Sequence, residues 1–157
     1  MLAPLATLIL QASTPQIRLP EVLRWDAPAA EVQRVLASRC TRLRDRPIAL
    51  PFLTGVRRQR QIDCEGFAFL GRGRHAEFVF GDDRLAMVWI MVSAAERRPI
   101  LAAMAAAFGV PSHRSGGFTA FAGHRIAWRD HPPELLFYAP EQAAEWLALF
   151  EASPSSR

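Results

Sequence analysis

The histidines of this chain are the first residues to consider for acid–base catalysis or metal binding, because imidazole serves in both. There are four, namely His75, His113, His124 and His131. No two of them are two or four residues apart, the spacing that brings side chains together on one strand or one helix. Three of the four fall in predicted turns or at strand ends, where a solvated histidine is usual. We therefore predict no metal site and no catalytic histidine.

Asp63 and Glu65 are the second candidates for acid–base chemistry. Residues two apart on a strand share a face, with side chains about 6.5–7 Å apart, and paired carboxylates act in glycoside hydrolysis. Three arginines stand close to this pair in the sequence, at Arg57, Arg58 and Arg60. We therefore expect a solvent-facing pair of acids that form ordinary ion pairs.

Motifs for nucleophilic catalysis and phosphate binding are missing from the sequence. It contains no GxSxG, and the glycine-rich stretch 71–74 lacks the GxxxxGK[ST] pattern and opens no predicted helix. We predict no catalytic residue and no cofactor, and the sequence favours a protein that is not an enzyme. The enzyme alternative that stays open is a small one built on His124 or His75 with a nearby carboxylate.

The first 17 residues carry no charged side chain. An apolar run from Leu2 to Leu10, followed by the small residues Ala12 and Ser13, is typical of a secretory signal peptide. We therefore predict a signal peptide at 1–13 and a periplasmic or secreted protein. A cytoplasmic protein that keeps these residues is the alternative. No stretch approaches the roughly 18 apolar residues of a membrane span, so we expect no transmembrane segment.

Cys40 and Cys64 are the two cysteines of the chain. They have neither CxxC spacing nor a further Cys or His at ligand spacing, so the sequence has no redox or zinc motif. In an exported protein, an even number of cysteines indicates pairing. A helix predicted over 26–40 places Cys40 on its buried face. Cys64 lies on a strand predicted over 59–70 and faces the core of the domain. We therefore predict a Cys40–Cys64 disulfide, which contributes on the order of 3 kcal/mol by the chain-entropy model.

All 19 basic residues are arginines, and the chain has no lysine and no asparagine. With abundant alanine, this composition is typical of a bacterial genome of high G+C content. Residues 18–60 contain ten arginines and four acids, a net charge of +6, whereas 61–157 carries −2. The basic part favours an anionic partner, either a protein or another envelope component, and we do not expect nucleic acid because its binding motifs are missing. The candidate partner-binding residues are Arg42, Arg44, Arg46, Arg57, Arg58 and Arg60.

Apolar periodicity and turn residues predict a helix followed by three strands, twice over, and then a last helix. The predicted helices span 26–40, 93–108 and 140–151, and the predicted strands span 59–70, 74–80, 84–92, 117–122, 124–129 and 134–138. In the first strand the apolar positions change parity after Cys64, which a β-bulge at Gly66 explains. The residues between the first helix and this strand, 41–58, are a long basic connection of a kind that is often functional.

The predicted fold class is α+β, with helices packed on antiparallel sheet in the order α-βββ-α-βββ-α. Similar Gly-Phe sequences at 65–72 and 116–124 would fit a degenerate tandem repeat with halves 26–92 and 93–139. The predicted signal peptide at 1–13 is followed by an extended lead-in at 14–25. One domain at 26–151 ends with the last helix, and a polar tail occupies 152–157.

In element order alone, the chain resembles two groups of small bacterial proteins. One group comprises envelope proteins built from tandem helix-plus-sheet repeats, including a β-lactamase-inhibitor type, and the other comprises dimeric secretion chaperones. Neither resemblance assigns a role to a residue of this sequence. The function we expect is that of a small exported envelope protein that is not catalytic and binds its partner through the basic segment 41–60. A cytosolic secretion chaperone or adaptor is the alternative.

Overall fold

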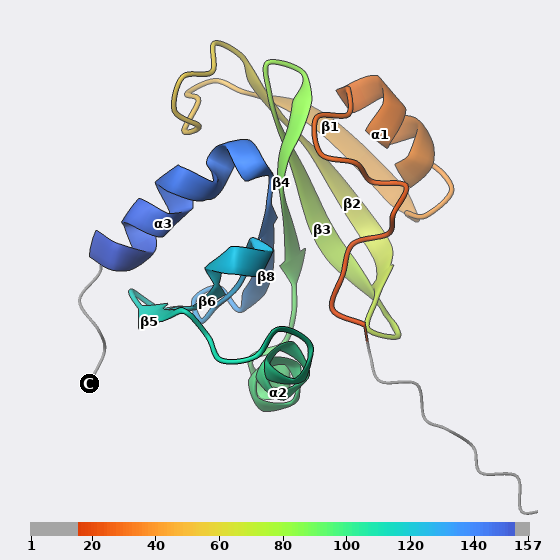
Figure 1. The fold of residues 1–157 in the computed structure, drawn as a ribbon. Helices are drawn as coiled ribbons and strands as arrows, with labels where there is room; N and C mark the ends of the chain where they lie inside the picture. The colour runs from red at the N-terminus through yellow and green to blue at the C-terminus, as the bar shows by residue number, and fades with distance from the viewer. Residues whose placement is uncertain (1–15, 153–157) are drawn as a thin grey trace, which may run out of the picture.

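One antiparallel sheet of eight strands organises the molecule (Figure 1). The structure, a computed structural model, describes residues 16–152, so the predicted signal peptide and most of the predicted tail lie outside the described residues. The strands lie in the order β1-β2-β3-β4-β8-β7-β6-β5, and the two halves of the sheet join where β4 pairs with β8. The strands are β1 (Arg42–Ile48), β2 (Gln59–Phe69), β3 (Arg72–Gly81), β4 (Arg84–Met91), β5 (His113–Ser115), β6 (Phe118–Phe121), β7 (Ile126–Arg129) and β8 (Glu134–Tyr138).

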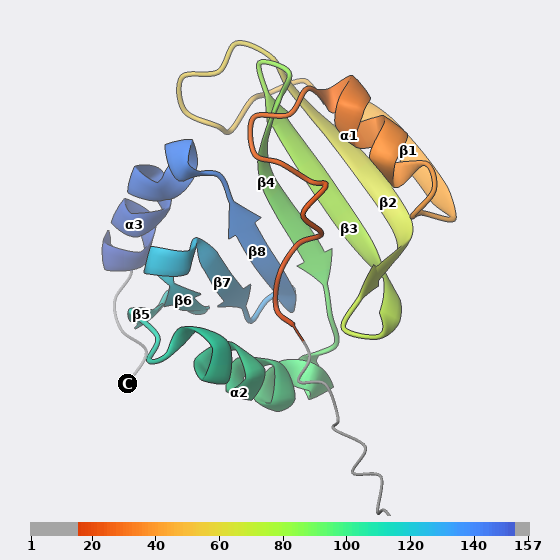
Figure 2. The ribbon, with the colours of Figure 1, turned by 45° about the vertical axis from the view of Figure 1, so that its right-hand side comes forward.

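Helices pack on both faces of this sheet, which confirms the predicted α+β class (Figures 1 and 2). The helices are α1 (Ala29–Leu36), α2 (Arg97–Phe108) and α3 (Ala143–Ala152), with short 3-10 turns η1 (Ala94–Glu96), η2 (Ala122–His124) and η3 (Pro140–Gln142). The first face of the sheet packs against α1 and α2, and the second face packs against α3. No helix within residues 16–152 has both the length and the apolar character needed to cross a membrane.

The predicted element order is wrong in one respect, because each half contains four strands after its helix and not three. The additional strands are β1 and β5. Strand β1 reads Arg-Leu-Arg-Asp-Arg-Pro-Ile and lies at the edge of the sheet, so it lacks the apolar alternation of a half-buried strand. Strand β5 has only three residues. Part of the predicted connection 41–58 is therefore sheet, paired with β2 from Arg42 opposite Glu65 to Ile48 opposite Gln59.

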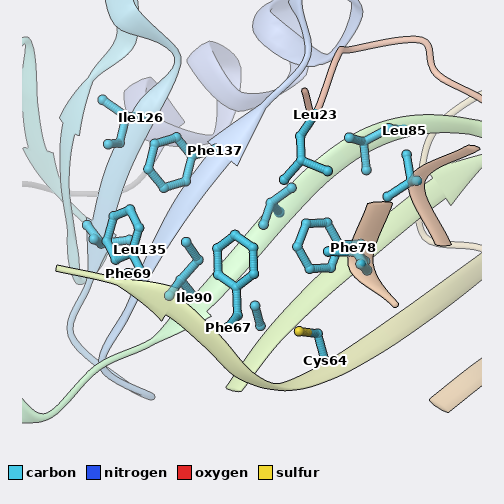
Figure 3. Packing of buried hydrophobic residues seen from close by; sticks show 14 of the residues in the cluster. Leu23, Cys64, Phe67, Phe69, Phe78, Leu85, Ile90, Ile126, Leu135 and Phe137 are labelled. Atoms are coloured by element: carbon cyan, nitrogen blue, oxygen red, sulfur yellow. The ribbon is translucent and has the colours of Figure 1, made fainter. Parts of the chain in front are cut away.

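The predicted β-bulge at Gly66 is confirmed. The register between β2 and β3 shifts between Cys64 and Phe67, and Gly66 has a φ of 79°, a left-handed value that glycine adopts without steric cost. The shift turns Phe67 and Phe69 to the same face as Cys64, where they are buried in the first-face core (Figure 3). Phe67 packs edge-to-face on Phe78, with the ring centroids 5.4 Å apart. The bulge thus keeps β2 apolar on its first face from Ile62 to Phe69.

The predicted lead-in 14–25 is described from residue 16 onward, and it contributes to the same core. Ile17 and Leu23 are both buried among the first-face side chains. Leu23 is drawn beside Phe78 and Leu85 in Figure 3. The lead-in therefore forms part of the folded unit and covers the sheet next to α1.

The predicted Cys40–Cys64 disulfide is present, with 5.5 Å between the two Cα atoms. Cys64 is fully buried in the first-face core, and Cys40 lies between α1 and β1. Thr41, the next residue, donates its backbone N–H to the carbonyl of Glu65 at 2.7 Å. The disulfide therefore fastens the start of the edge strand β1 to its neighbour β2.

Arg74 and Glu96 join the sheet to the start of α2. Glu96 completes a capping box with Ser93, whose backbone N–H donates to the Glu96 carboxylate at 2.9 Å. The side chain of Arg74 is only 6% exposed, and it donates two parallel hydrogen bonds of 2.9 Å to the same carboxylate. The bonds from Arg74, with the one from the Ser93 backbone, lower the pKa of Glu96 from 4.5 to about 2.

Replacing Glu96 with glutamine should lower the stability at neutral pH and leave it nearly unchanged in strong acid. Because the folded-state pKa lies below the unfolded one, the Glu96 contribution is complete above about pH 4.5 and is lost as the pH falls towards 2. We expect Glu96→Gln to lower the free energy of unfolding at pH 7 by about 1.5–3 kcal/mol. Urea unfolding at pH 7, 4 and 2 measures this loss. Glu151→Gln at an exposed position of α3 is the control, and an equal loss at pH 7 and pH 2 would contradict the prediction.

Candidate functional site

The second face of the sheet is polar on β1, β2 and β3, where its side chains alternate with the buried residues of the first face. These strands carry arginines, then acids and glutamines, then a histidine and a glutamate: Arg42, Arg44 and Arg46; Glu65, Asp63, Gln61 and Gln59; and His75 and Glu77. From Val79 of β3 and strand β4 onward, the same face is mainly apolar and packs against α3, with Arg129 and Glu134 as its charged pair. The polar strip therefore ends where the apolar core under α3 begins.

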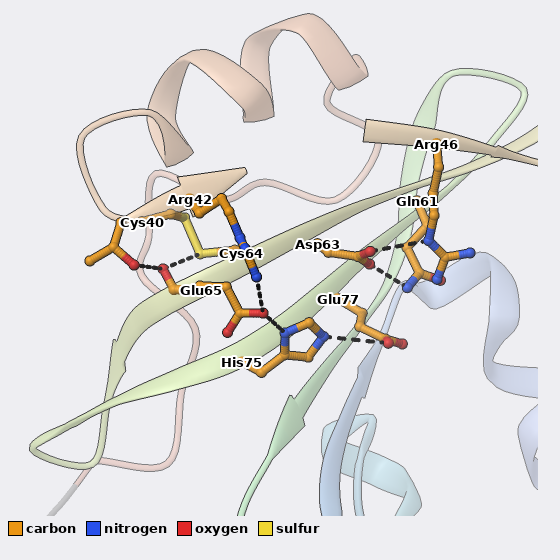
Figure 4. A network of polar contacts seen from close by, with 10 residues as sticks. Cys40, Arg42, Arg46, Gln61, Asp63, Cys64, Glu65, His75 and Glu77 are labelled. Atoms are coloured by element: carbon orange, nitrogen blue, oxygen red, sulfur yellow. Dashed lines mark hydrogen bonds and ion pairs between the residues drawn. A yellow bond between two sulfur atoms is a disulfide. The ribbon is translucent and has the colours of Figure 1, made fainter. Parts of the chain in front are cut away.

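His75 stands among three carboxylates on this strip (Figure 4). Its Nδ1 lies 2.8 Å from Glu65 Oε1, and its Nε2 lies 3.6 Å from Glu77 Oε1. Asp63 is opposite Glu77 in the register of β2 and β3. One donor atom from each of Asp63, His75 and Glu77 lies within 4.8 Å of the other two, and all three residues are half-buried. We name Asp63, Glu65, His75 and Glu77 the acid–histidine cluster.

Neighbouring polar side chains hold two acids of this cluster in place. Asp63 accepts hydrogen bonds from Arg46 Nε at 3.1 Å and from Gln61 Nε2 at 2.6 Å. Glu65 forms an ion pair with Arg42 at 3.7 Å. Both arginines belong to the edge strand β1, so this strand positions the acids. The cluster can hold a proton between histidine and carboxylate, and its donor atoms are of the types that bind a cation.

A cleft of about 310 Å³ adjoins the cluster. Glu77 lines it together with Met87 and Trp89 of β4 and with Arg129 of β7. The other lining residues come from the loop 49–58, from η3 and from α3, namely Phe52, Leu53, Gln142, Glu145, Trp146 and Leu149. The Thr54 hydroxyl donates to the Glu145 carboxylate at 2.9 Å and so ties this loop to α3. The cleft combines aromatic side chains with charged groups from the sheet and from α3.

Arg129, a charged group of the cleft, has two close partners. Its guanidinium carbon lies 4.3 Å from the centre of the Trp89 ring. Its side chain forms an ion pair with Glu134, which is 1% exposed. Burial lowers the pKa of Arg129 from its ordinary value, and the charge of Glu77 acts in the opposite direction. A positive charge is therefore held between the acid–histidine cluster and the apolar core under α3.

The six arginines predicted to bind a partner do not form one patch. Arg60 lies on the first-face side of β2, because it alternates with the second-face residues Gln59 and Gln61. The arginines with an internal carboxylate partner are Arg42, Arg46 and Arg60. Of these six, the exposed arginines without an ion pair to any carboxylate of residues 16–152 are Arg44, Arg57 and Arg58. Only the second set is available to an outside partner without loss of an internal ion pair.

Exposed apolar side chains lie in the same loop 49–58 as two of these arginines. Leu50 is 85% exposed and Phe52 is 56% exposed. A hollow of about 600 Å³ is lined in part by Arg57 and Arg58. The Asp82 carboxylate accepts the backbone N–H groups of both arginines, at 3.2 and 3.0 Å, and so anchors this end of the loop. The loop thus presents charge and apolar surface together.

The other three histidines have different surroundings. His113 contacts the hydroxyl of its neighbouring serine, His124 stacks on Phe108 with the ring centroids 4.8 Å apart, and His131 is exposed in the turn before β8. Within residues 16–152, no carboxylate lies within ion-pair distance of these three rings. Of the two histidines in the enzyme alternative, only His75 has adjacent carboxylates.

Sequence analysis identified Asp63, Glu65 and His75 but not their association, and it missed Glu77 and Arg129. The available signal for Glu77 was its spacing of two from His75 on one strand, which places both on the same face. Comparisons with protein-family models, with curated proteins and with solved structures gave no match to this chain.

Proposed function

We propose that this chain is a small, exported, non-catalytic envelope protein that binds an acidic surface of a partner protein through the loop 49–58 and strand β1. The observation that carries the proposal is the exposure of Arg44, Arg57 and Arg58 without carboxylate partners in the described part of the chain, in the segment that also exposes Leu50 and Phe52. Arginine and aromatic side chains are enriched in protein interfaces and supply much of their binding energy. An acidic protein surface can pair with these arginines and also pack against the exposed apolar side chains.

The disulfide supports the exported part of the proposal, because disulfides persist in oxidising compartments and cytosolic thiols are kept reduced. The intact mass of the native protein from fractionated cells, alkylated with and without prior reduction, tests it. We expect a chain that lacks residues 1–12 or 1–13, with thiols that react only after reduction. A full-length cytosolic chain with free thiols would favour the secretion-chaperone or adaptor alternative.

Replacing Arg44, Arg57 and Arg58 together with glutamine should weaken partner binding at least about tenfold and leave the stability unchanged. Pull-downs from an envelope extract, with bound proteins quantified by mass spectrometry at low and high salt, measure the effect. The control removes three exposed arginines elsewhere, as Arg34→Gln/Arg98→Gln/Arg114→Gln.

The informative proteins are those that the wild type and the control variant capture and the Arg44/Arg57/Arg58 variant does not. Their binding should also weaken as salt is added, because exposed charges are screened. If the wild type, the control variant and the Arg44/Arg57/Arg58 variant captured the same proteins in equal amounts, the proposed interface would be contradicted. Binding to phosphatidylglycerol vesicles without any captured protein would favour a lipid partner.

A further inference from the structure

We propose that Asp63, His75 and Glu77 bind one divalent transition-metal ion of the Zn²⁺ type on the second face of the sheet. Their donor atoms lie within 4.8 Å of one another. They project from β2 and β3, whose pairing sets Asp63 opposite Glu77. Its three ligands come from β2 and β3 and not from the loop 49–58, so the metal proposal does not depend on the proposed partner binding. It departs from the expectation of no metal site, which rested on the spacing of the histidines alone.

Glu65 gives His75 the orientation of a metal ligand. A metal-binding histidine usually donates its second ring N–H to a carboxylate or a carbonyl, which fixes its tautomer. The contact of 2.8 Å between His75 Nδ1 and Glu65 Oε1 is a bond of this kind. With the proton on Nδ1, the lone pair of Nε2 is on the side of Glu77, 3.6 Å away. Glu65 is therefore a positioning residue.

Small side-chain movements would bring the three donors to bonding distance. Zn²⁺ binds imidazole nitrogen and carboxylate oxygen at about 2.0–2.2 Å, which places two ligand atoms of a tetrahedron about 3.3–3.6 Å apart. The side chains of His75 and Glu77 are 31% and 27% exposed, so their rotation displaces water and not core side chains. Three protein ligands leave a fourth position for water.

The charges around the site also suit a cation. The bonds from Arg46 and Gln61 occupy one lone pair on each oxygen of Asp63, and each oxygen has a second. Glu77 has no arginine within ion-pair distance among residues 16–152, and the attraction between its charge and Arg129 acts at longer range. One imidazole with two carboxylates suits a transition metal, whereas Mg²⁺ and Ca²⁺ prefer ligand sets made of oxygen.

Titration of the purified, tag-free protein with Zn²⁺ by calorimetry, and with Co²⁺ by visible absorption, tests the site. We expect one equivalent of metal per chain with a micromolar or lower dissociation constant, and a Co²⁺ absorption typical of four or five ligands. A large excess of Mg²⁺ should not compete. The absence of saturable Zn²⁺ and Co²⁺ binding at metal concentrations up to about 1 mM, which corresponds to a binding free energy weaker than about −4 kcal/mol, would overturn the proposal.

Single replacements separate the ligands from the positioning residue. His75→Ala and Glu77→Gln should each abolish the one-equivalent binding, and Glu65→Gln should weaken it about 10–100-fold. His113→Gln removes a histidine outside the cluster and should bind like the wild type. Glu77→Gln keeps the side-chain shape and so provides a second test where His75→Ala alters folding. Unchanged metal affinity in either ligand variant would overturn the assignment.

Discussion

Replacing Arg129 with methionine is expected to lower the free energy of unfolding by about 3–5 kcal/mol at pH 7. The replacement leaves the Glu134 carboxylate, which is 1% exposed, without its ion-pair partner. It also removes the cation that lies over the Trp89 ring. Burial of a lone carboxylate favours its protonation, so the loss should be smaller at pH 5 than at pH 8. Urea unfolding at the two pH values measures both effects.

Two further variants show whether loss of the Arg129–Glu134 ion pair causes the destabilisation of Arg129→Met. Arg129→Met/Glu134→Met removes both charges and should recover much of the loss, because apolar side chains of similar size can replace a buried ion pair. Arg98→Met, at an exposed position of α2, should change the stability by no more than about 0.5 kcal/mol. A double variant no more stable than Arg129→Met would show that the buried ion pair does not explain the effect.

Replacing Cys40 and Cys64 together with alanine should lower the free energy of unfolding by about 3 kcal/mol. The disulfide closes a loop with a sequence separation of 24 residues, for which the chain-entropy model gives a value near 3 kcal/mol. The bond also fastens the edge strand β1, so backbone amides of β1 should exchange faster in the variant than in the wild type. Urea unfolding and hydrogen exchange measure the two effects.

Dithiothreitol provides the matched control for the disulfide. It should destabilise the wild type by a similar amount and leave the double-alanine variant unchanged. Amides of α3, which packs on the opposite face from Cys64, should keep their protection relative to the global stability. An unfolding midpoint of the wild type that dithiothreitol does not change would contradict a stabilising role for the bond.

The bulge and the disulfide could be predicted because each depends on a local pattern. The apolar positions of β2 change parity after Cys64, and one extra residue is the simplest way to keep them on one face. Gly66 lies at the change and adopts the left-handed conformation without strain. The same parity of apolar positions predicts that Cys64 faces the core, as the predicted helix does for Cys40.

Strand β1 could not be predicted because its position in the sheet removes the usual signal. An edge strand packs little apolar surface, so its sequence need not alternate. Pro47 argues against predicting a strand here, yet proline is tolerated in an edge strand, which has no second neighbour. Only the pairing with β2 shows that these residues are sheet, and the positioning of Asp63 by Arg46 depends on that pairing.

The acid–histidine cluster depends on the register between β2 and β3. A prediction that places the turn between them even one residue off gives a different register. The predicted strands end at 70 and begin again at 74, whereas β2 and β3 are separated only by Leu70 and Gly71, with φ values of 50° and 73°. Two positive φ values are the signature of the tight hairpin turn that matches strand twist. This turn, together with the bulge, places Asp63 opposite Glu77. The sequence contains the residues of the cluster, and their meeting depends on backbone geometry.

The open edge of the sheet bears on how the protein behaves at high concentration. No described strand pairs with the outer side of β1, and an unpaired edge is a template for fibril growth. Pro47 has no backbone N–H to offer to such a template. Two copies aligned edge to edge would also bring rows of arginine against each other. The edge therefore discourages pairing between the β1 strands of two copies of the chain.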